Sequence, residues 1–394
     1  MNFKNVVVGA GMAGSVIARR LAEEKNEQVL IIEKRNHTGG NCYDYYDDAG
    51  ILVHKYGPHI FHTNSRAVWQ WLERFTEWRV YQHRVRAYVD GRTVPMPITV
   101  ETVNELFGLS LSTLDIEAWF KRQAVPQGQT ALEELPGGAI QNAEDFIVSQ
   151  VGEAIYEKIF KHYTYKQWGK YPDQLKPDLM KRVPIRFTRD DRYFTDRYQG
   201  LPARGYYRLF ENMLDHPNIK IMLNTNWQDV KDALDFDRLY FTGKIDEYFD
   251  YKLGRLEYRS LRFEYETYQL EAAGSRGGGS GGASDRSGGS DSGFFQEAAV
   301  VNYPNDYDFT RITEYKQLTG QISLATTIAK EYPQSDGEPY YVVPDDRNEE
   351  LAEQYRGLAA GEGSKENFIG RLAEYKYYNM DRIVERALDV DLGD

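Results

Sequence analysis

The chain has 394 residues, of which 48 are Lys or Arg and 60 are Asp or Glu, so its formal net charge is −12. This length allows two or three domains with ample cores, and the acidity argues against a protein that neutralises a nucleic-acid backbone. Any anionic ligand must therefore be held by local positive groups. The single cysteine, Cys42, excludes an intrachain disulfide framework and a cysteine-based zinc site.

The N-terminus does not have the pattern of a signal peptide, because residues 1–8 lead directly into a structured motif. No stretch approaches the ~20 apolar residues that a membrane-spanning helix needs. We therefore expect a cytoplasmic protein without a membrane span.

The first elements follow the order strand, helix, strand. A mainly apolar run over residues 5–9 enters a glycine-rich turn, and apolar residues on one face predict a helix over 12–25. The run at 28–33 is apolar up to its last residue, as in strands buried within a parallel sheet.

A glycine motif occupies the turn between the first strand and this helix. Gly9, Gly11 and Gly14 form the pattern G-x-G-x-x-G, and Glu33 closes the second strand 22 residues after Gly11. The glycines allow a tight turn, a close approach to a pyrophosphate and close packing of helix on strand, while Glu33 accepts hydrogen bonds from ribose hydroxyls. The pattern predicts a dinucleotide site, and it suits FAD and NAD equally.

The elements that follow alternate between helices and strands. The periodicity predicts helices over 66–78, near 101–107 and 115–122, over 144–168 and 345–360, and after Asn379. It predicts strands over 85–89 and 93–96, joined by a turn at Asp90-Gly91, and over 219–223, 238–241, 260–265 and 367–369.

This alternation favours an α/β fold in which a Rossmann-like domain is accompanied by a helical insert domain and a mainly antiparallel β-sheet domain. Two patterns described below make the first of these an FAD-binding Rossmann-like domain. We expect domains that are discontinuous in sequence. The Rossmann-like domain takes 1–85, 205–260 and 360–394, the helical domain takes 99–180, and the sheet domain takes 86–98, 181–204, 261–273 and 294–345.

Residues 274–293 contain nine glycines and six serines, with no large apolar side chain. Such a composition cannot bury enough surface to offset the entropy of ordering, so we interpret the segment as a flexible insertion between the strands 261–268 and 298–303. The alternative is a linker between two independent domains. No catalytic role is expected for it.

Two further patterns favour FAD over NAD. The stretch from Arg35 to Asn41 resembles the R-x-x-x-G-G extension of flavoproteins, and Gly370-Arg371 resembles their second signature at the end of a short strand. No second dinucleotide fingerprint is present.

At this point the chain resembles the bacterial type of UDP-galactopyranose mutase. The resemblance rests on ten blocks in one order, at 8–14, 56–63, 163–168, 181–186, 191–194, 258–262, 301–303, 310–314, 339–341 and 370–381. It implies an isomerase that interconverts UDP-galactopyranose and UDP-galactofuranose. It also implies that N5 of reduced FAD is the nucleophile at the anomeric carbon, and that UDP stays in the site.

The resemblance also assigns roles to single residues. The catalytic residues would be Arg182, Arg311, His62 and His83. The substrate-binding residues would be Phe160, Tyr163, Thr164, Trp168, Arg182, Tyr193, Asn302, Arg311, Tyr341, Tyr377 and Asn379. Two arginines and several phenols suit a diphosphate, because guanidinium stays charged and phenols donate hydrogen bonds. Taken singly, each could instead be a surface ion pair or a packed aromatic side chain.

The cofactor-binding residues would be Gly9, Gly11, Met12, Ala13, Gly14, Glu33, Lys34, Gly40, Asn41, His59, Ile60, Gly370, Arg371, Tyr378, Asn379 and Met380. His62 would lie by the flavin ring, and the helix after Asn379 would direct its N-terminus at the reduced ring. Asn379 is interpreted as a neutral hydrogen-bonding residue. No metal site is expected.

Residues 169–179 are the expected mobile lid over the substrate. The expected partners are UDP, the two UDP-sugars and an external reductant, and the family implies a homodimer. Two rival hypotheses remain at this level: an FAD-dependent oxidoreductase of the amine-oxidase type, and a non-catalytic binding protein of the GDP-dissociation-inhibitor type.

Overall fold

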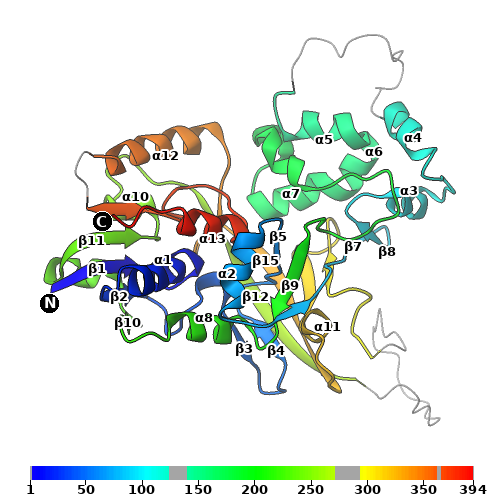
Figure 1. The fold of residues 1–394 in the computed structure, drawn as a ribbon. Helices are drawn as coiled ribbons and strands as arrows, with labels where there is room; N and C mark the ends of the chain where they lie inside the picture. Colours follow the sequence, from blue (N-terminus) through cyan, green and yellow to red (C-terminus); the bar gives the residue numbers. More distant parts are fainter. Residues whose placement is uncertain (1, 124–139, 271–292, 362–364, 394) are drawn as a thin grey trace.

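The computed structural model describes residues 2–123, 140–270, 293–361 and 365–393. A parallel sheet flanked by helices lies beside a larger, mainly antiparallel sheet, and a group of helices stands at the end of the second sheet (Figure 1). This arrangement confirms the predicted α/β class with its helical insert. Most of residues 274–293 lie outside the described residues, and the domain boundaries stay predictions.

The first sheet has five strands, and all of its pairings are parallel. Their order across the sheet is β10 (Ile219–Met222), β2 (Val29–Ile32), β1 (Asn2–Val8), β11 (Asp235–Phe241) and β17 (Glu366–Phe368). All four residues of β2 are buried, which explains its apolar run. Since β2 and β11 flank β1 on opposite sides, the order of strands reverses there, and ligands bind at such a point beyond the carboxyl ends.

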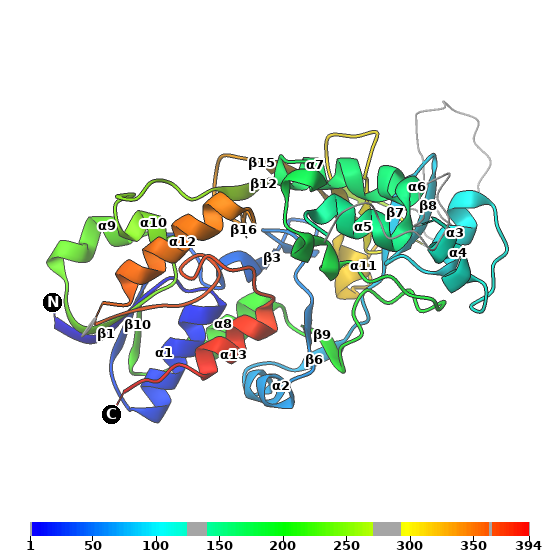
Figure 2. The same cartoon turned by 90° about the horizontal axis from the view of Figure 1, so that it is seen from above.

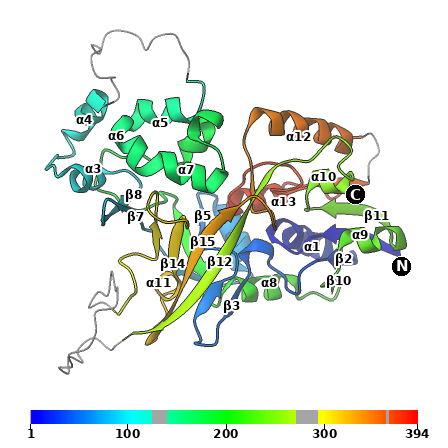
Figure 3. The same cartoon turned by 180° about the vertical axis from the view of Figure 1, so that it is seen from behind.

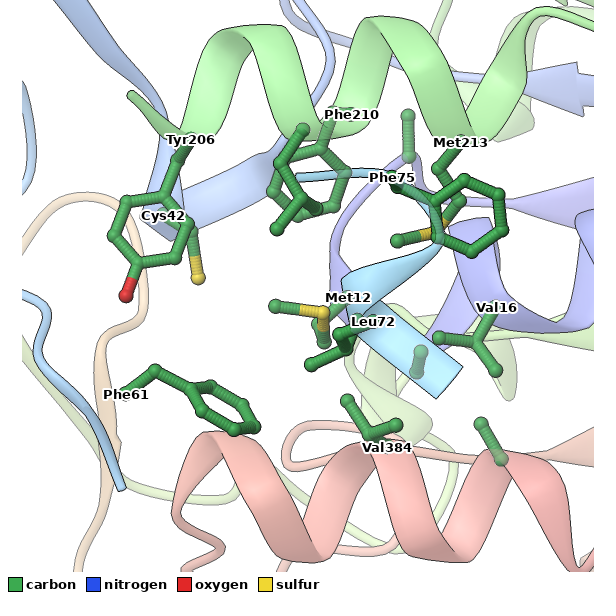
Figure 4. Close-up of a cluster of buried hydrophobic side chains, with 14 of the residues drawn as sticks. Met12, Val16, Cys42, Phe61, Leu72, Phe75, Tyr206, Phe210, Met213 and Val384 are labelled. Carbon is green, nitrogen blue, oxygen red and sulfur yellow. The ribbon is translucent and has the colours of Figure 1, made fainter. Parts of the chain in front are cut away.

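Helices cover both faces of this sheet (Figure 2). One face carries α1 (Met12–Glu24), α8 (Tyr206–Leu214) and α13 (Met380–Leu388), and the other carries α9 (Trp227–Val230), α10 (Ile245–Tyr248) and α12 (Asp346–Ala359). Figure 4 shows the core on the first face, where Val16, Phe210 and Val384 come from the three helices. This packing fixes the N-termini of α1 and α13 beside the strand ends.

The second sheet has seven strands, and its two longest, β12 (Tyr258–Gln269) and β15 (Ala325–Gln334), are seen from behind in Figure 3. The order of the strands is β16 (Tyr341–Val342), β12, β15, β14 (Arg311–Glu314), β13 (Val300–Asn302), β7 (Val85–Val89) and β8 (Arg92–Met96). Only β13 and β7 pair in parallel. The predicted hairpin turn is confirmed, with positive φ at Asp90 and Gly91.

β12 and β13, which flank the glycine- and serine-rich segment, belong to one sheet. This argues against the alternative that the segment is a linker between independent domains.

The helical insert contains α3 (Val100–Phe107), α4 (Ile116–Gln123), α5 (Ala143–Val151), α6 (Glu153–Ile155), a π-helical turn (Tyr156–Phe160) and α7 (Lys161–Trp168). The prediction of one helix over 144–168 is wrong at Gly152, whose φ of +78° ends α5. Apolar spacing continues across this break, so periodicity alone did not reveal it. After this break the chain passes through the π turn into α7, which contacts β15 of the second sheet.

Two small sheets complete the fold. The pair β3 (Asp44–Tyr46) and β4 (Leu52–His54) is antiparallel, and β9 (Tyr198–Pro202) lies between β5 (Phe61–Thr63) and β6 (Trp78–Val80). The predicted helix over 66–78 is too long, because α2 (Arg66–Glu73) ends earlier and Trp78 begins a strand. The aromatic side chain of Trp78 instead stacks on Trp69, with ring centroids 4.4 Å apart.

Candidate functional site

A cleft of about 440 Å³ opens at the carboxyl ends of β1, β2 and β11. Its walls come from the first glycine turn, the residues after β2 and β11, the start of α9, the segment before β16 and the N-terminus of α13. Twelve of the predicted cofactor-binding residues line it: Gly9, Gly11, Met12, Ala13, Glu33, Lys34, Gly40, Asn41, His59, Gly370, Arg371 and Met380. The other four, Gly14, Ile60, Tyr378 and Asn379, lie within two residues of a lining residue without lining the cleft themselves.

The glycine turn is too crowded for other side chains. A Cβ on Gly14 would lie 2.0 Å from the carbonyl oxygen of Gly9, and a Cβ on Gly9, whose φ is +101°, would lie 2.1 Å from Oγ1 of Thr242. A Cβ on Gly40 would lie 2.9 Å from Cα of Gly11, so two glycines face each other across the turn. The backbone here can therefore approach a pyrophosphate at the N-terminus of α1.

Glu33 holds this turn in place. Its side chain is buried, one carboxylate oxygen accepts the N–H of Ala10 at 2.8 Å, and the other accepts the N–H of Arg35 at 2.9 Å. Each oxygen keeps a further lone pair for a ribose hydroxyl. Glu33 therefore has both the position and the spare acceptors that the sequence predicted.

Sequence reasoning missed several walls of the cleft. Thr242, Gly243 and Lys244 follow β11, and Thr242 donates its hydroxyl to the carbonyl of Val8 at 2.7 Å. The sequence signal for these residues was a Thr-Gly pair directly after a strand. It places them in the cleft only if that strand lies next to β1, and the sequence does not show which strand does. Glu338 was also missed; it pairs with Lys34 at 2.7 Å and contacts Arg35 at 3.5 Å across the cleft mouth.

A second cluster of polar groups lies on the larger sheet. Asn302, Arg311 and Glu331 are direct cross-strand neighbours on β13, β14 and β15. Nη2 of Arg311 donates to the phenol oxygen of Tyr163 at 2.9 Å, and its Nε lies 3.3 Å from Oε1 of Glu331. Oδ1 of Asn302 and Nε of Arg311 are buried and have no hydrogen-bond partner among the described residues. Asn302 therefore keeps an acceptor for a donor group of a ligand, whereas of these two groups only the guanidinium of Arg311 can face an anion.

Burial and mutual attraction set the charges of Arg311 and Glu331. Burial is the largest single influence and works to lower the pKa of Arg311, but Glu331 together with the surrounding tyrosines outweighs it, and the pKa is raised above its usual value. Burial raises the pKa of Glu331, and Arg311 opposes that shift. The guanidinium therefore stays charged.

Phenols surround Arg311. Burial raises the pKa of Tyr163, of Tyr193 to about 12, and of Tyr341. All three phenols stay protonated near neutral pH and can donate hydrogen bonds to an anion. The ring of Tyr341 stacks on that of Tyr377 with centroids 6.0 Å apart, and Trp168 tilts against it at the same distance.

The remaining predicted substrate residues lie on the adjoining elements. Phe160 and Thr164 are buried at the π turn and on α7, and Asn379 is the N-cap of α13. Arg182 ends a short 3-10 helix (Pro177–Arg182), and its side chain lies outside the described part of the structure.

The predicted histidines have different surroundings. Burial lowers the pKa of His83 to about 3, with smaller contributions from Arg311 and His62, so this ring is neutral near pH 7. Tyr81 lies 3.2 Å from its Nδ1. Burial lowers the pKa of His59 to about 4, and its Nδ1 bonds with the carbonyl of Gly57 at 2.8 Å. His62 is part of a separate hydrogen-bonded group with Asp196.

The cleft borders the second cluster, which consists of Arg311, Glu331, Asn302 and the phenols of Tyr163, Tyr193 and Tyr341. We call it the arginine–phenol cluster. Arg371 lines the cleft, and its guanidinium carbon lies 4.9 Å from the ring centroid of Tyr377 and 5.8 Å from that of Tyr341. Tyr340 lines the cleft, and the next residue, Tyr341, belongs to the cluster. A dinucleotide in the cleft would therefore end beside a group of side chains suited to a second, anionic ligand.

Ion pairs tie the predicted lid, 169–179, to the residues just before β12 and at the start of α12. Lys170 lies 3.2 Å from a carboxylate oxygen of Glu257 and also contacts Asp345, while Lys176 lies 3.0 Å from Asp346. These contacts hold the segment against the start of α12. Its mobility stays a prediction.

Neither a membrane-spanning helix nor a metal-binding cluster is found among the described residues. Within the described ranges, no helix has both the length and the apolar character needed to cross a membrane. The same residues include no group of three or more His, Cys, Asp and Glu side chains placed to hold a metal ion.

Comparison with protein families gives two matches. A family model described as UDP-galactopyranose mutase matches residues 158–276 and 286–377, and one described as an NAD(P)-binding Rossmann-like domain matches residues 7–75. Together they include the glycine turn of the cleft and most of the arginine–phenol cluster.

Curated relatives align along almost the whole chain. A probable UDP-galactopyranose mutase of Klebsiella pneumoniae is 37% identical, over 98% of this chain and 94% of that protein. A dTDP-fucopyranose mutase of Escherichia coli is 34% identical, over 98% and 97%. A crystal structure of reduced UDP-galactopyranose mutase matches the fold with a TM-score of 0.72 at 17% identity, over 98% of this chain and 94% of that one.

Proposed function

The chain belongs to the UDP-galactopyranose mutase family, and on that premise we propose that it is an isomerase that interconverts UDP-galactopyranose and UDP-galactofuranose with FAD as its cofactor. The observation that carries this proposal is the shared border between the dinucleotide cleft and the arginine–phenol cluster at Tyr340–Tyr341 and Arg371. A reaction that needs a flavin and a nucleotide-sugar side by side requires such an arrangement.

The residues of the cleft fit FAD. The crowded glycine turn and Glu33 suit the adenosine and pyrophosphate end, and Met380 lines the cleft at the N-terminus of α13, where partial positive charge favours an electron-rich ring. When bound in its reduced form, FAD would supply N5 as a nucleophile for the anomeric carbon. The protein contributes binding, orientation and control of charge.

Arg311 and the phenols of Tyr163, Tyr193 and Tyr341 would hold the diphosphate. The guanidinium stays charged and the phenols stay protonated, so both kinds of group can donate hydrogen bonds to phosphate oxygens. These groups can bind UDP before and after its bond to the sugar breaks. Retaining UDP in this way keeps it in position to attack the sugar again, which an isomerisation requires. By resemblance, Arg182 is the second arginine of this pocket.

The rival hypotheses account for less of the site. A flavin oxidase of the amine-oxidase type needs the cleft, but it has no need for a buried guanidinium ringed by protonated phenols. A binding protein of the GDP-dissociation-inhibitor type needs no cleft suited to FAD. The E. coli relative is named for dTDP-fucopyranose, so a 6-deoxysugar attached to dTDP is the strongest competing substrate.

A parallel assay tests the proposal. Dithionite-reduced, FAD-loaded protein is incubated anaerobically with UDP-galactofuranose and, separately, with dTDP-fucofuranose, and the pyranose products are separated by chromatography. We expect ready conversion of the UDP-sugar and little conversion of the dTDP-sugar, with no conversion of either by oxidised protein. A larger kcat/KM for dTDP-fucofuranose would reassign the substrate, and conversion of neither would overturn the proposal.

Three expected properties stay predictions. The resemblance implies the external reductant that would keep the flavin reduced and the homodimer, and the N-terminal sequence leads us to expect the cytoplasmic location. The closing movement of residues 169–179 over UDP is a fourth, and protection of that segment from proteolysis by saturating UDP would test it.

A further inference from the structure

The ring of His62 is held on two sides by the loop before β9. Its Nδ1 lies 2.9 Å from Oδ2 of Asp196, and its face stacks on Phe194 with ring centroids 3.7 Å apart and planes within 14°. A stacked ring cannot tilt freely, and a ring nitrogen bonded to a carboxylate is protonated at that nitrogen. The neutral imidazole therefore has its proton on Nδ1 and offers Nε2 as an acceptor.

Asp196 is itself oriented by a directional chain of hydrogen bonds. The backbone N–H of Arg197 donates to Oδ1 of Asn64 at 2.9 Å, which fixes the Asn64 amide so that its Nδ2 donates to Oδ1 of Asp196 at 2.8 Å. Oδ2 of Asp196 is then left to accept from His62. Gln199 clamps the same loop by donating to the carbonyls of Phe194 at 3.2 Å and Asp196 at 2.8 Å.

His62 lies between the two parts of the candidate site. It sits on β5, shortly after the cleft-lining His59, and β5 contacts α13, whose first residue Met380 lines the cleft. On the other side, Phe194, on which His62 stacks, has its ring centroid 6.0 Å from that of His83, and the ring of His83 lies 5.9 Å from that of Tyr193. The ring of His62 therefore lies between elements that line the cleft and the residues beside Arg311.

We propose that Asp196 is a positioning residue that fixes the tautomer and orientation of His62 at this border, so that Nε2 is presented as a hydrogen-bond acceptor to the reacting groups. This inference rests on the proposed function for its kinetic consequence, but the tautomer itself can be measured without any turnover. A carboxylate in this relation to histidine sets which ring nitrogen is available.

The variant Asp196→Asn separates this role from simple packing. Because Asn64 presents its Nδ2 hydrogens, the new amide must turn its oxygen toward Asn64 and its NH₂ toward Nδ1 of His62. The imidazole then has to accept at Nδ1 and place its proton on Nε2. We expect the tautomer of His62 to invert and kcat to fall about 10–100-fold, with KM and FAD content little changed.

The exchanged pair Asn64→Asp with Asp196→Asn provides the rescue. The carboxylate introduced at position 64 can only accept, so it would take the N–H of Arg197 and the NH₂ of the amide introduced at position 196. The oxygen of that amide is then left facing His62. The total charge equals that of the starting protein, and the Nδ1–H tautomer should return with most of kcat. Asp191→Asn is the matched control, because that exposed carboxylate pairs with Arg84 at 2.9 Å and does not contact His62.

The readout is the ¹⁵N spectrum of histidine-labelled, FAD-loaded protein at about pH 8, where neutral rings predominate. Seven histidines keep this spectrum simple, and a His62→Ala sample assigns the signals. Nδ1 of His62 should resonate as a protonated nitrogen in the starting protein, the control and the exchanged pair, and as an unprotonated one in Asp196→Asn. An unchanged tautomer in Asp196→Asn, or no recovery in a folded exchanged pair, would overturn the inference. Failure of the starting protein to turn over any sugar nucleotide would instead count against the proposed function.

Discussion

The dinucleotide cleft and the arginine–phenol cluster are built in different ways. The core of the cleft is one continuous stretch, in which Gly9 to Gly14 and Glu33 lie on consecutive elements of a strand–helix–strand unit. The cluster joins Tyr163 of the helical insert to Arg311 and Glu331 of two neighbouring strands. Steric exclusion shapes the cleft, whereas the balance of buried charges shapes the cluster. The two regions should therefore respond to mutation in separable ways.

The largest expected effect is on the cleft. In Gly14→Ala the added methyl would lie 2.0 Å from the carbonyl oxygen of Gly9, so α1 must move away from the turn. We expect nearly all bound FAD to be lost and the free energy of unfolding to fall by about 1–3 kcal/mol. The measurements are the ratio of FAD to protein after gel filtration and a urea titration.

Gly357→Ala on α12 is the control for this change. No heavy atom of the described residues lies within 4 Å of its added Cβ, so FAD content should not change, and stability should rise by about 0.5–1 kcal/mol. A Gly14→Ala protein that keeps one FAD per chain would contradict the steric account of the turn.

The next effect concerns the cluster alone. Arg311→Lys keeps the charge but removes the fork that reaches Tyr163 and Glu331. We expect kcat/KM to fall about 100-fold, equivalent to about 2.7 kcal/mol of transition-state stabilisation, and UDP to bind more weakly. FAD content should be unchanged, since the cleft is separate. Arg262→Lys, on the exposed side of β12, is the matched control; equal losses in both variants would remove the special role of Arg311.

A smaller effect should follow from removing one phenol. Tyr163→Phe deletes the oxygen that accepts from Nη2 of Arg311, together with one donor to the diphosphate. About a tenfold loss of kcat/KM is expected, or about 1.4 kcal/mol. Tyr46→Phe, at a side chain that is 51% exposed, should leave kcat/KM as it was. Steady-state kinetics on the UDP-sugar would decide, and loss of FAD from Tyr163→Phe would show that the two regions are not separable.

Acid should destabilise both regions through their buried histidines. Burial lowers the pKa of His59 in the cleft to about 4 and of His83 beside the cluster to about 3, below the value of about 6.5 in an unfolded chain. Below pH 6.5 the unfolded state binds protons that these neutral native rings do not. Their contribution to stability is therefore complete above pH 6.5 and is lost as the pH falls toward 4, by about 1.4 kcal/mol per pH unit for each histidine.

Urea titrations between about pH 7.5 and 4.5 would measure this dependence. Replacing His83 by Gln should make the free energy of unfolding depend less steeply on pH, by the equivalent of about one bound proton. A slope that stays the same in that variant would mean that His83 is not buried in its neutral form.

The sequence predicted the cleft well because its determinants are local. The glycine spacing and Glu33 are constrained by one turn and two flanking elements, and twelve of sixteen predicted residues line the cleft. Thr242 and Glu338 were missed because their position depends on strand order and on a distant loop. The helix over 144–168 was wrong because the apolar period runs through Gly152 despite its positive φ.

The cluster could not be derived from local pattern. Arg311 becomes a neighbour of Glu331 only through the pairing of β14 with β15, and no periodicity encodes that register. Glu331 was not predicted; the other residues of the cluster were predicted through family resemblance, and their roles stay proposals. Asp196 was not predicted at all, because its partner His62 is 134 positions away in the sequence.

The most direct test of the account follows product and flavin together. Photoreduced, FAD-loaded protein receives a large excess of UDP-galactofuranose under strict anaerobiosis, while the flavin absorbance is recorded throughout and UDP-galactopyranose is quantified. We predict many product molecules for each flavin, with the flavin still fully reduced at the end. Product limited to one per flavin, or flavin oxidation in step with turnover, would contradict the claim that the cleft and the cluster together form a mutase site.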